Sequence, residues 1–222
     1  MQKLDTRKEM LLSAIVREHS RTAEPVASDV LKKQMDISSA TIRNEMVILE
    51  KEGYLRQPHT SAGRVPTEQG YRYYIINCLE HRNVNDNVRS LKIMMHGIDE
   101  DEARMKRLAK ELAGEVREGV FVGFALGSTF YTGLSYLFEQ PEFESVDLVR
   151  SLSEIIDNLD RVVKDLFNEI TPGVQVYIGS ENPFGNECGT VLLKLKRPPM
   201  LGVLGPMRMD YDKTISIMKE ME

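Results

Sequence analysis

A block of short alternating elements between residues 38 and 75 constrains the fold of this chain more than any other feature. It runs SSATIRNEMVILEKEGYLRQPHTSAGRVPTEQGYRYYI. A Ser-capped helix ends at Gly53, and two short strands, YLRQ and RVP, then flank the loop PHTSAG. Thr67 caps a further helix that runs to about Leu79. The strand, loop and strand after a polar-tipped helix predict a wing.

Two more helices are expected ahead of this block. Asp5 or Thr6 caps the first, which extends to about Ser20, with Glu9 placed for a capping box. Pro25 suits the first position of the second, which extends to about residue 34 and is followed by a tight turn. The full order predicts a winged helix-turn-helix DNA-binding domain over residues 1–80.

The third helix carries the side chains best suited to reading DNA. Ile42, Met46 and Leu49 recur at helical spacing and predict a buried face, which leaves Arg43 and Asn44 pointing outward. Arg pairs bidentately with guanine and Asn with adenine in the major groove. Phosphate contacts are expected from the helix start and the wing. The full set of expected DNA-binding residues is Ser39, Thr41, Arg43, Asn44, Arg56, His59, Thr60, Ser61, Arg64 and Arg72.

Charge is distributed unevenly along the chain. The formal net charge is −5, yet residues 1–80 carry 12 Lys and Arg against 11 Asp and Glu, and residues 119–222 carry 9 against 15. This split suits a nucleic-acid module followed by an acidic regulatory module. The small basic excess of residues 1–80 also leaves open a different class, a protein-interaction or ligand-sensing module whose winged fold does not bind DNA.

Residues 81–118 are expected to form a helical linker. Apolar residues step by three and four along it, with a break near HGIDED at 96–101. The seam suits either pairing with a second copy of the chain or packing against the chain's own domain. The residues expected to contribute to dimerisation are Val84, Val88, Leu91, Met95, Ile98, Met105 and Leu112.

The carboxyl half, residues 119–222, predicts an α+β domain. VFVGFAL, VQVYI, TVLLKL and MLGVLG are expected strands, and residues 146–170 form an amphipathic helix or helix pair. Asp210 is expected to cap a closing helix. A few antiparallel strands flanked by long helices are typical of a sensor-like domain.

Composition excludes several functional classes. Cys78 and Cys188 are far apart, and the four histidines lack metal-ligand spacing, so no disulfide framework, metal site or cofactor is expected. We find no nucleophile motif or phosphate-binding glycine loop and expect no catalytic residue. The start of the chain does not predict a secretory signal, and no apolar run approaches the roughly 20 residues of a membrane span, so a cytoplasmic protein is expected.

Five stretches together resemble the bacterial heat-inducible transcription repressor family, HrcA. They are SSATIRNEM, LEKEGYLRQPHTSAGRVPTEQGYRYY, GLSYLFEQPEF, IGSENPFG and LGVLGPMRMDY. The resemblance implies a winged helix-turn-helix domain followed by a GAF-like domain, and a homodimer that represses chaperone operons by binding an inverted-repeat operator. It also implies the chaperonin as a partner that keeps the repressor active until heat-unfolded protein occupies it. The recognition-helix motif falls on residues 39–46 and the wing motif on residues 59–66.

The chain departs from this family in its middle. Typical members are longer and carry more of the sensor sheet and an inserted dimerisation region before the block that begins here at Gly133. The resemblance therefore implies a reduced GAF-like domain, and the seam between residues 84 and 116 is the obvious substitute dimer surface. Whether the GAF-like half binds a small ligand, positions the dimer or unfolds on heating stays open.

Overall fold

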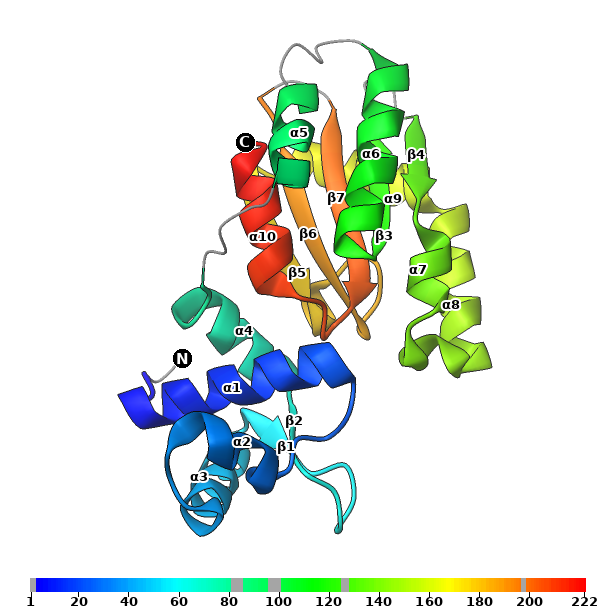
Figure 1. Ribbon diagram of the computed structural model, residues 1–222. Coiled ribbons are helices and arrows are strands. Elements are labelled where there is room, and N and C mark those ends of the chain that lie inside the picture. Colours follow the sequence, from blue (N-terminus) through cyan, green and yellow to red (C-terminus); the bar gives the residue numbers. More distant parts are fainter. Residues whose placement is uncertain (1–2, 81–85, 96–100, 125–127, 197–198) are drawn as a thin grey trace. The chain divides into compact units, whose positions relative to one another are not determined.

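The structure is a computed structural model that describes residues 3–80, 86–95, 101–124, 128–196 and 199–222. The chain divides into two compact units. One comprises Met1–Glu80 with Arg208–Asp210, and the other comprises His81–Met207 with Tyr211–Glu222. Figure 1 shows mostly helices in the first unit and a larger sheet flanked by helices in the second. The mixed α+β class expected from the sequence is confirmed.

The first unit has the order of elements that the sequence predicts. Its elements are α1 (Thr6–Thr22), α2 (Ser28–Met35), α3 (Ser39–Lys51), β1 (Leu55–Arg56), β2 (Val65–Pro66) and α4 (Glu68–Asn77). β1 and β2 run antiparallel, with Leu55 opposite Pro66. Each strand has only two residues, which is shorter than expected.

Side-chain caps set where two of these helices begin. The Asp5 carboxylate accepts hydrogen bonds of 3.0 Å from two backbone N–H groups in the first turn of α1. The Thr67 hydroxyl likewise accepts one of 3.1 Å from the first turn of α4. Each cap satisfies N–H groups that have no partner within the helix. The caps expected at Asp5 and Thr67 are therefore confirmed.

The capping box expected between Thr6 and Glu9 is wrong, because Glu9 serves a tertiary contact. The Tyr73 hydroxyl donates to Glu9 Oε1 at 2.6 Å and accepts from the backbone N–H of Leu4 at 2.9 Å. Burial, reinforced by the hydrogen bond to Glu9, raises the pKa of Tyr73 to about 12. The phenol therefore stays protonated and ties α4 to the start of α1.

The second helix begins later than expected, at Ser28 instead of Pro25. The backbone N–H and C=O of Val26 exchange two 2.9 Å hydrogen bonds with those of Arg64. This pairing holds the chain after Pro25 in an extended conformation, so the helix cannot start there. It also adds a third backbone segment to the β1–β2 pair.

The second unit is built on a five-stranded antiparallel sheet of order β4-β3-β7-β6-β5. Its strands are β3 (Gly119–Gly123), β4 (Thr129–Thr132), β5 (Gly173–Ile178), β6 (Cys188–Lys194) and β7 (Met200–Pro206). Its α-helices are α5 (Asp86–Met95), α6 (Glu102–Val116), α7 (Leu134–Phe138), α8 (Val146–Asp157), α9 (Leu159–Glu169) and α10 (Tyr211–Glu220). The sequence pattern does not predict β4 or α7, which are short and lack regular apolar periodicity.

Helices cover both faces of this sheet (Figure 1). α6 packs on β3, and α10 packs on β5 and β6, while the apolar sides of α8 and α9 pack on the opposite face. On that face the Phe121 ring lies 5.0 Å from the Phe184 ring and directly opposite Gly202. A Cβ at Gly202 would lie 2.1 Å from the Phe121 ring, so the missing side chain makes room for the phenylalanine.

The described part of the expected dimer seam is largely buried within the second unit. Leu91, Met105 and Leu112 are 2%, 1% and 0% exposed, and α6 packs against both α5 and β3. Met95 is half-buried. Val84, Ile98 and the side chain of Val88 lie outside the described residues. The three buried side chains agree with the alternative of helices packed on their own domain, because α5 and α6 belong to the same compact unit as the sheet.

We expect Gly70→Ala to destabilise the first unit, although alanine normally favours a helix by about 1 kcal/mol over glycine. A Cβ at Gly70 would lie 2.2 Å from the backbone oxygen of Tyr54, so α4 would have to shift. Hydrogen–deuterium exchange of the α4 amides should become faster. The control Gly114→Ala, in a helix position with no atom within 3.8 Å of the new Cβ, should slow exchange locally. Equal protection in both variants would contradict the close packing at Gly70.

We expect Leu112→Ala to lower the free energy of unfolding of the second unit by about 2–5 kcal/mol, because it opens a cavity in a fully buried position. The melting temperature should fall by the same amount at every protein concentration. The exposed neighbour Glu111→Ala should change stability by less than about 0.5 kcal/mol. A loss that is small at low protein concentration and grows as the concentration rises would instead place Leu112 between two copies.

Candidate functional site

The start of α3 is closed by a side-chain cap. The Ser38 hydroxyl accepts a 3.1 Å hydrogen bond from the backbone N–H of Thr41 and lies 2.9 Å from the Thr41 hydroxyl. The Thr41 hydroxyl is therefore in contact with the capping side chain, a local contact that residue type alone does not reveal. Ser39 is half-buried beside it. The backbone N–H groups of this first turn still form the positive end of the helix dipole.

Beyond the cap, α3 separates apolar and polar side chains cleanly. Ile42, Met46 and Leu49 are buried, as the spacing predicts. Arg43 and Asn44 are exposed on the opposite side, within the first two turns. Both side chains are free to reach a partner that approaches this face of the helix. The structure thus places the two expected base-reading residues side by side on one surface.

The loop between β1 and β2 presents a second exposed polar group. Arg56, His59, Thr60 and Ser61 are all exposed. Between them the loop is closed by a 2.9 Å backbone hydrogen bond from Ala62 to His59. These four expected residues therefore stand on a short ordered projection that can follow a phosphate backbone.

Two of the expected DNA-binding arginines are engaged in ion pairs with carboxylates of their own unit. The Arg64 guanidinium lies 2.9 Å from Glu50 Oε2 and its side chain is only 13% exposed. Arg72 pairs with Glu68 at 2.8 Å, one turn earlier on α4. Both arginines are thus placed to support the structure of the unit, because a carboxylate of the same unit binds each guanidinium.

Ion pairing also explains how a nearly neutral unit exposes a cationic surface. The carboxylates between residues 39 and 66 are Glu45, Glu50 and Glu52, and they pair with Arg7 at 3.8 Å, Arg64 at 2.9 Å and Lys8 at 2.8 Å, respectively. In the same described segment Arg43, Lys51 and Arg56 are exposed and form no ion pair. The unpaired charge of this segment is therefore positive.

Lys51 and Gln57 are two candidate residues that the sequence analysis missed. Lys51 lies eight residues after Arg43, two turns further along the same exposed stripe of α3. That spacing was available in the sequence as a signal. Gln57 Nε2 donates to the backbone oxygens of Thr60 and Ala62 at 2.9 and 3.0 Å. Its role depends on loop geometry that residue type does not reveal.

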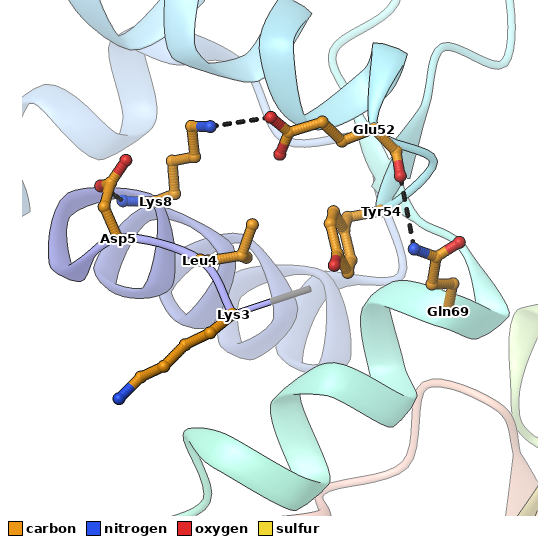
Figure 2. A pocket seen from close by; sticks show the side chains of 7 residues that line it. All are labelled: Lys3, Leu4, Asp5, Lys8, Glu52, Tyr54 and Gln69. Carbon is orange, nitrogen blue, oxygen red and sulfur yellow. Dashed lines mark hydrogen bonds and ion pairs between the residues drawn. The ribbon is translucent and has the colours of Figure 1, made fainter. Parts of the chain in front are cut away.

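A polar pocket of about 420 Å³ lies in the first unit between the start of α1, the end of α3 and the start of α4 (Figure 2). Its lining residues are Lys3, Leu4, Asp5, Lys8, Glu52, Tyr54 and Gln69. Lys8 Nζ binds Glu52 Oε1 at 2.8 Å, which raises the pKa of Lys8, and Gln69 Nε2 donates to the Glu52 backbone oxygen at 3.3 Å. The raised pKa keeps the Lys8 amine protonated, so this lysine is not poised as a nucleophile.

The second unit has a small pocket between the sheet, α7 and α8. Its volume is about 20 Å³, which admits about one water molecule, whereas metabolite pockets measure roughly 300 Å³ or more. Burial raises the pKa of the Cys188 thiol to about 12, so this cysteine is not poised as a nucleophile. Within the described residues no three His, Cys, Asp or Glu side chains gather as metal ligands. No helix in the described part of the chain is both long and apolar enough to cross a membrane.

Comparisons with known proteins agree on one family. A family model described as the HrcA protein C terminal domain matches residues 10–215. A heat-inducible transcription repressor HrcA from Carboxydothermus hydrogenoformans is 26% identical over 334 aligned positions, covering 96% of this chain and 94% of the relative. The protein of the same name from Caldanaerobacter subterraneus subsp. tengcongensis is 46% identical over 112 residues, which are 50% of this chain and 33% of the relative.

A solved structure shares the fold. A crystal structure at 2.2 Å resolution, described as that of a hypothetical protein, superposes with a TM-score of 0.80 at 20% identity, covering 99% of this chain and 96% of the other. The Carboxydothermus alignment has 334 positions against the 222 residues of this chain, so at least 112 positions of that relative face gaps. This agrees with a shortened member. From the match over residues 10–215 and the relatives that span nearly the whole chain, we conclude that the protein belongs to the HrcA family of heat-inducible transcription repressors.

Proposed function

We propose that this chain represses transcription by binding duplex DNA through a winged helix-turn-helix domain formed by the first unit. One observation carries the proposal: Arg43 and Asn44 stand exposed on the first turns of α3, beside a projecting loop, on a segment whose unpaired charge is positive. The relatives are named as heat-inducible repressors, which supports regulation of heat-shock genes. The names of these relatives describe a transcription regulator and not an enzyme.

The major groove of duplex DNA is the surface into which α3 would fit. A helix fits into this groove with its amino-terminal turns against the base edges. Arg43 can then donate two hydrogen bonds to guanine, and Asn44 can pair with the adenine edge. The N–H groups at the Ser38 end of α3 can hold a phosphate oxygen. In this arrangement Arg43 and Asn44 supply sequence preference.

The projecting loop and its flanks fit the DNA backbone. Arg56, His59, Thr60 and Ser61 offer charged and neutral donors to phosphates or to a narrow minor groove. Lys51 lies further along α3 and can add a phosphate contact. The phosphate contacts are independent of sequence and supply salt-dependent affinity, whereas a minor-groove contact would depend on groove width and so on sequence.

We propose that two copies act together on an inverted repeat. Two winged domains on half-sites about one helical turn apart, or a multiple of it, would match the two-fold symmetry of such an operator. The second unit, His81–Met207 with Tyr211–Glu222, would be the GAF-like regulatory and dimerisation unit. Because Leu91, Met105 and Leu112 are enclosed in it, the contact between copies would use other side chains.

A bacterial repressor of this kind would act in the cytoplasm, with the chaperonin as the partner that maintains its activity.

The alternative function is a protein-interaction or ligand-sensing module. It is motivated by the small basic excess of residues 1–80. Against it, Glu45, Glu50 and Glu52 are paired with cations, so the unpaired charge of this segment is positive despite the small excess. A gel shift against random duplex separates the two functions. DNA binding predicts a shift at low salt, and the alternative predicts none. Footprinting upstream of the organism's own chaperonin genes should then reveal a protected inverted repeat.

We expect Arg43→Ala to weaken operator binding by about 1–3 kcal/mol and to relax the preference for the guanine it contacts, because a bidentate base contact is lost. Arg56→Ala should weaken binding to all duplexes alike and lower the slope of log affinity against log salt by about 1 per copy. The matched control is Arg161→Ala, an exposed arginine of the second unit, which should change neither quantity. If the Arg43→Ala variant binds the operator as tightly as the Arg161→Ala variant does, and prefers it over random duplex to the same degree, the assignment of Arg43 is contradicted.

A further inference from the structure

The projecting loop is fastened from within by one side chain. Gln57 Nε2 donates both of its hydrogens to the loop, one to the backbone oxygen of Thr60 at 2.9 Å and one to that of Ala62 at 3.0 Å. A primary amide has two such hydrogens, so its donor capacity is fully used here. The exposed residues between these points are thereby held in one curved conformation.

A second fastening joins the loop to α3. Arg64 Nε and Nη2 lie 3.0 and 2.9 Å from Glu50 Oε2, and Nη1 approaches the backbone oxygen of Gly63 at 3.4 Å. Glu50 lies in the last turn of α3, on the helix that carries Arg43. Because two guanidinium nitrogens meet one carboxylate oxygen, this charge-assisted contact restricts the angle between the loop and the helix.

The third fastening is made by the backbone. Arg64 exchanges two 2.9 Å hydrogen bonds with Val26, which lies between α1 and α2. A Cβ at Gly63 would lie 2.3 Å from the Val26 backbone oxygen, so only glycine lets the two segments approach this closely. The base of the loop is thus joined both to α3 and to the chain ahead of α2.

Glu50 is unexpected on electrostatic grounds if the first unit binds DNA. A carboxylate near a phosphate backbone opposes binding, so its removal should strengthen affinity unless it has another task. Its partner Arg64 is 13% exposed on its side chain, which leaves little of the guanidinium open to a phosphate. The geometry of both residues is that of a brace within the protein.

We infer that Glu50, Arg64 and Gln57 are positioning residues that set the loop against α3 before DNA arrives, and that Arg64 acts through Glu50 instead of contacting DNA. The inference rests on the proposed DNA-binding function. A loop ordered in advance loses less conformational entropy on binding, so its contacts contribute more to affinity. Heat or a mutation that loosens the brace would weaken DNA binding without removing any contact residue.

The test uses the full-length chain and the operator found by footprinting. Glu50→Gln should weaken operator binding roughly tenfold, and Arg64→Met about equally, with the double variant no weaker than either single variant, as for coupled neighbours. The slope of log affinity against log salt should stay at the wild-type value in Arg64→Met. Arg64→Lys should not restore affinity, because an ammonium group cannot make the same two-nitrogen contact.

Gln57→Met provides a second variant that leaves the ion pair and the charge untouched. It should also weaken binding, with faster hydrogen exchange of the loop amides at residues 59–62 and unchanged exchange in α1. This readout distinguishes a loosened loop from an unfolded unit. Unchanged exchange in the loop together with unchanged affinity would contradict the role of Gln57.

The outcomes separate this inference from the function on which it rests. If the wild-type chain gives no gel shift with any duplex, the proposed function itself is wrong. If the wild type binds and Glu50→Gln binds equally or more tightly, the brace is overturned while DNA binding stands. If Arg64→Met instead lowers the slope of log affinity against log salt by about 0.9 per copy, and Arg64→Lys binds as tightly as the wild type, then Arg64 contacts a phosphate and is not part of the brace.

Discussion

The burial of one face of α3 is the constraint on which the candidate site depends. Ile42, Met46 and Leu49 are enclosed by the first unit, so the helix cannot rotate without exposing them to water. That constraint alone determines that Arg43 and Asn44 face outward. The cap at Ser38 then sets where the helix begins, and therefore how far these two side chains stand from its positive end.

The arrangement of charge shows why overall composition says little about a binding surface. The chain is acidic, and the first unit is almost neutral, yet each carboxylate between residues 39 and 66 is paired with a cation of the same unit. Pairing leaves a few unmatched cations on the surface of α3 and the loop. Interactions between exposed charges decay within about 10 Å at moderate salt, so a binding surface depends on the local balance of charge and not on the total.

Features set by local chemistry were predictable from the sequence, and features set by tertiary pairing were not. Helix order, the caps at Asp5 and Thr67 and the buried face of α3 follow from residue type and spacing over a few positions. The ion pair of Arg64 depends on a residue fourteen positions away in sequence. The seam through Met105 and Leu112 had the right periodicity, but periodicity does not say whether the surface that covers it belongs to the same chain.

The fastening of the loop has a consequence for redesign of its specificity. Between Gln57 and Gly63 the outermost residues, 58–61, are exposed and their side chains carry no part of the brace. Gly63, by contrast, tolerates no side chain against Val26. A combinatorial library intended to retarget this module should therefore randomise these four tip positions together and hold the anchor residues constant, so that every member presents its new side chains from one common scaffold.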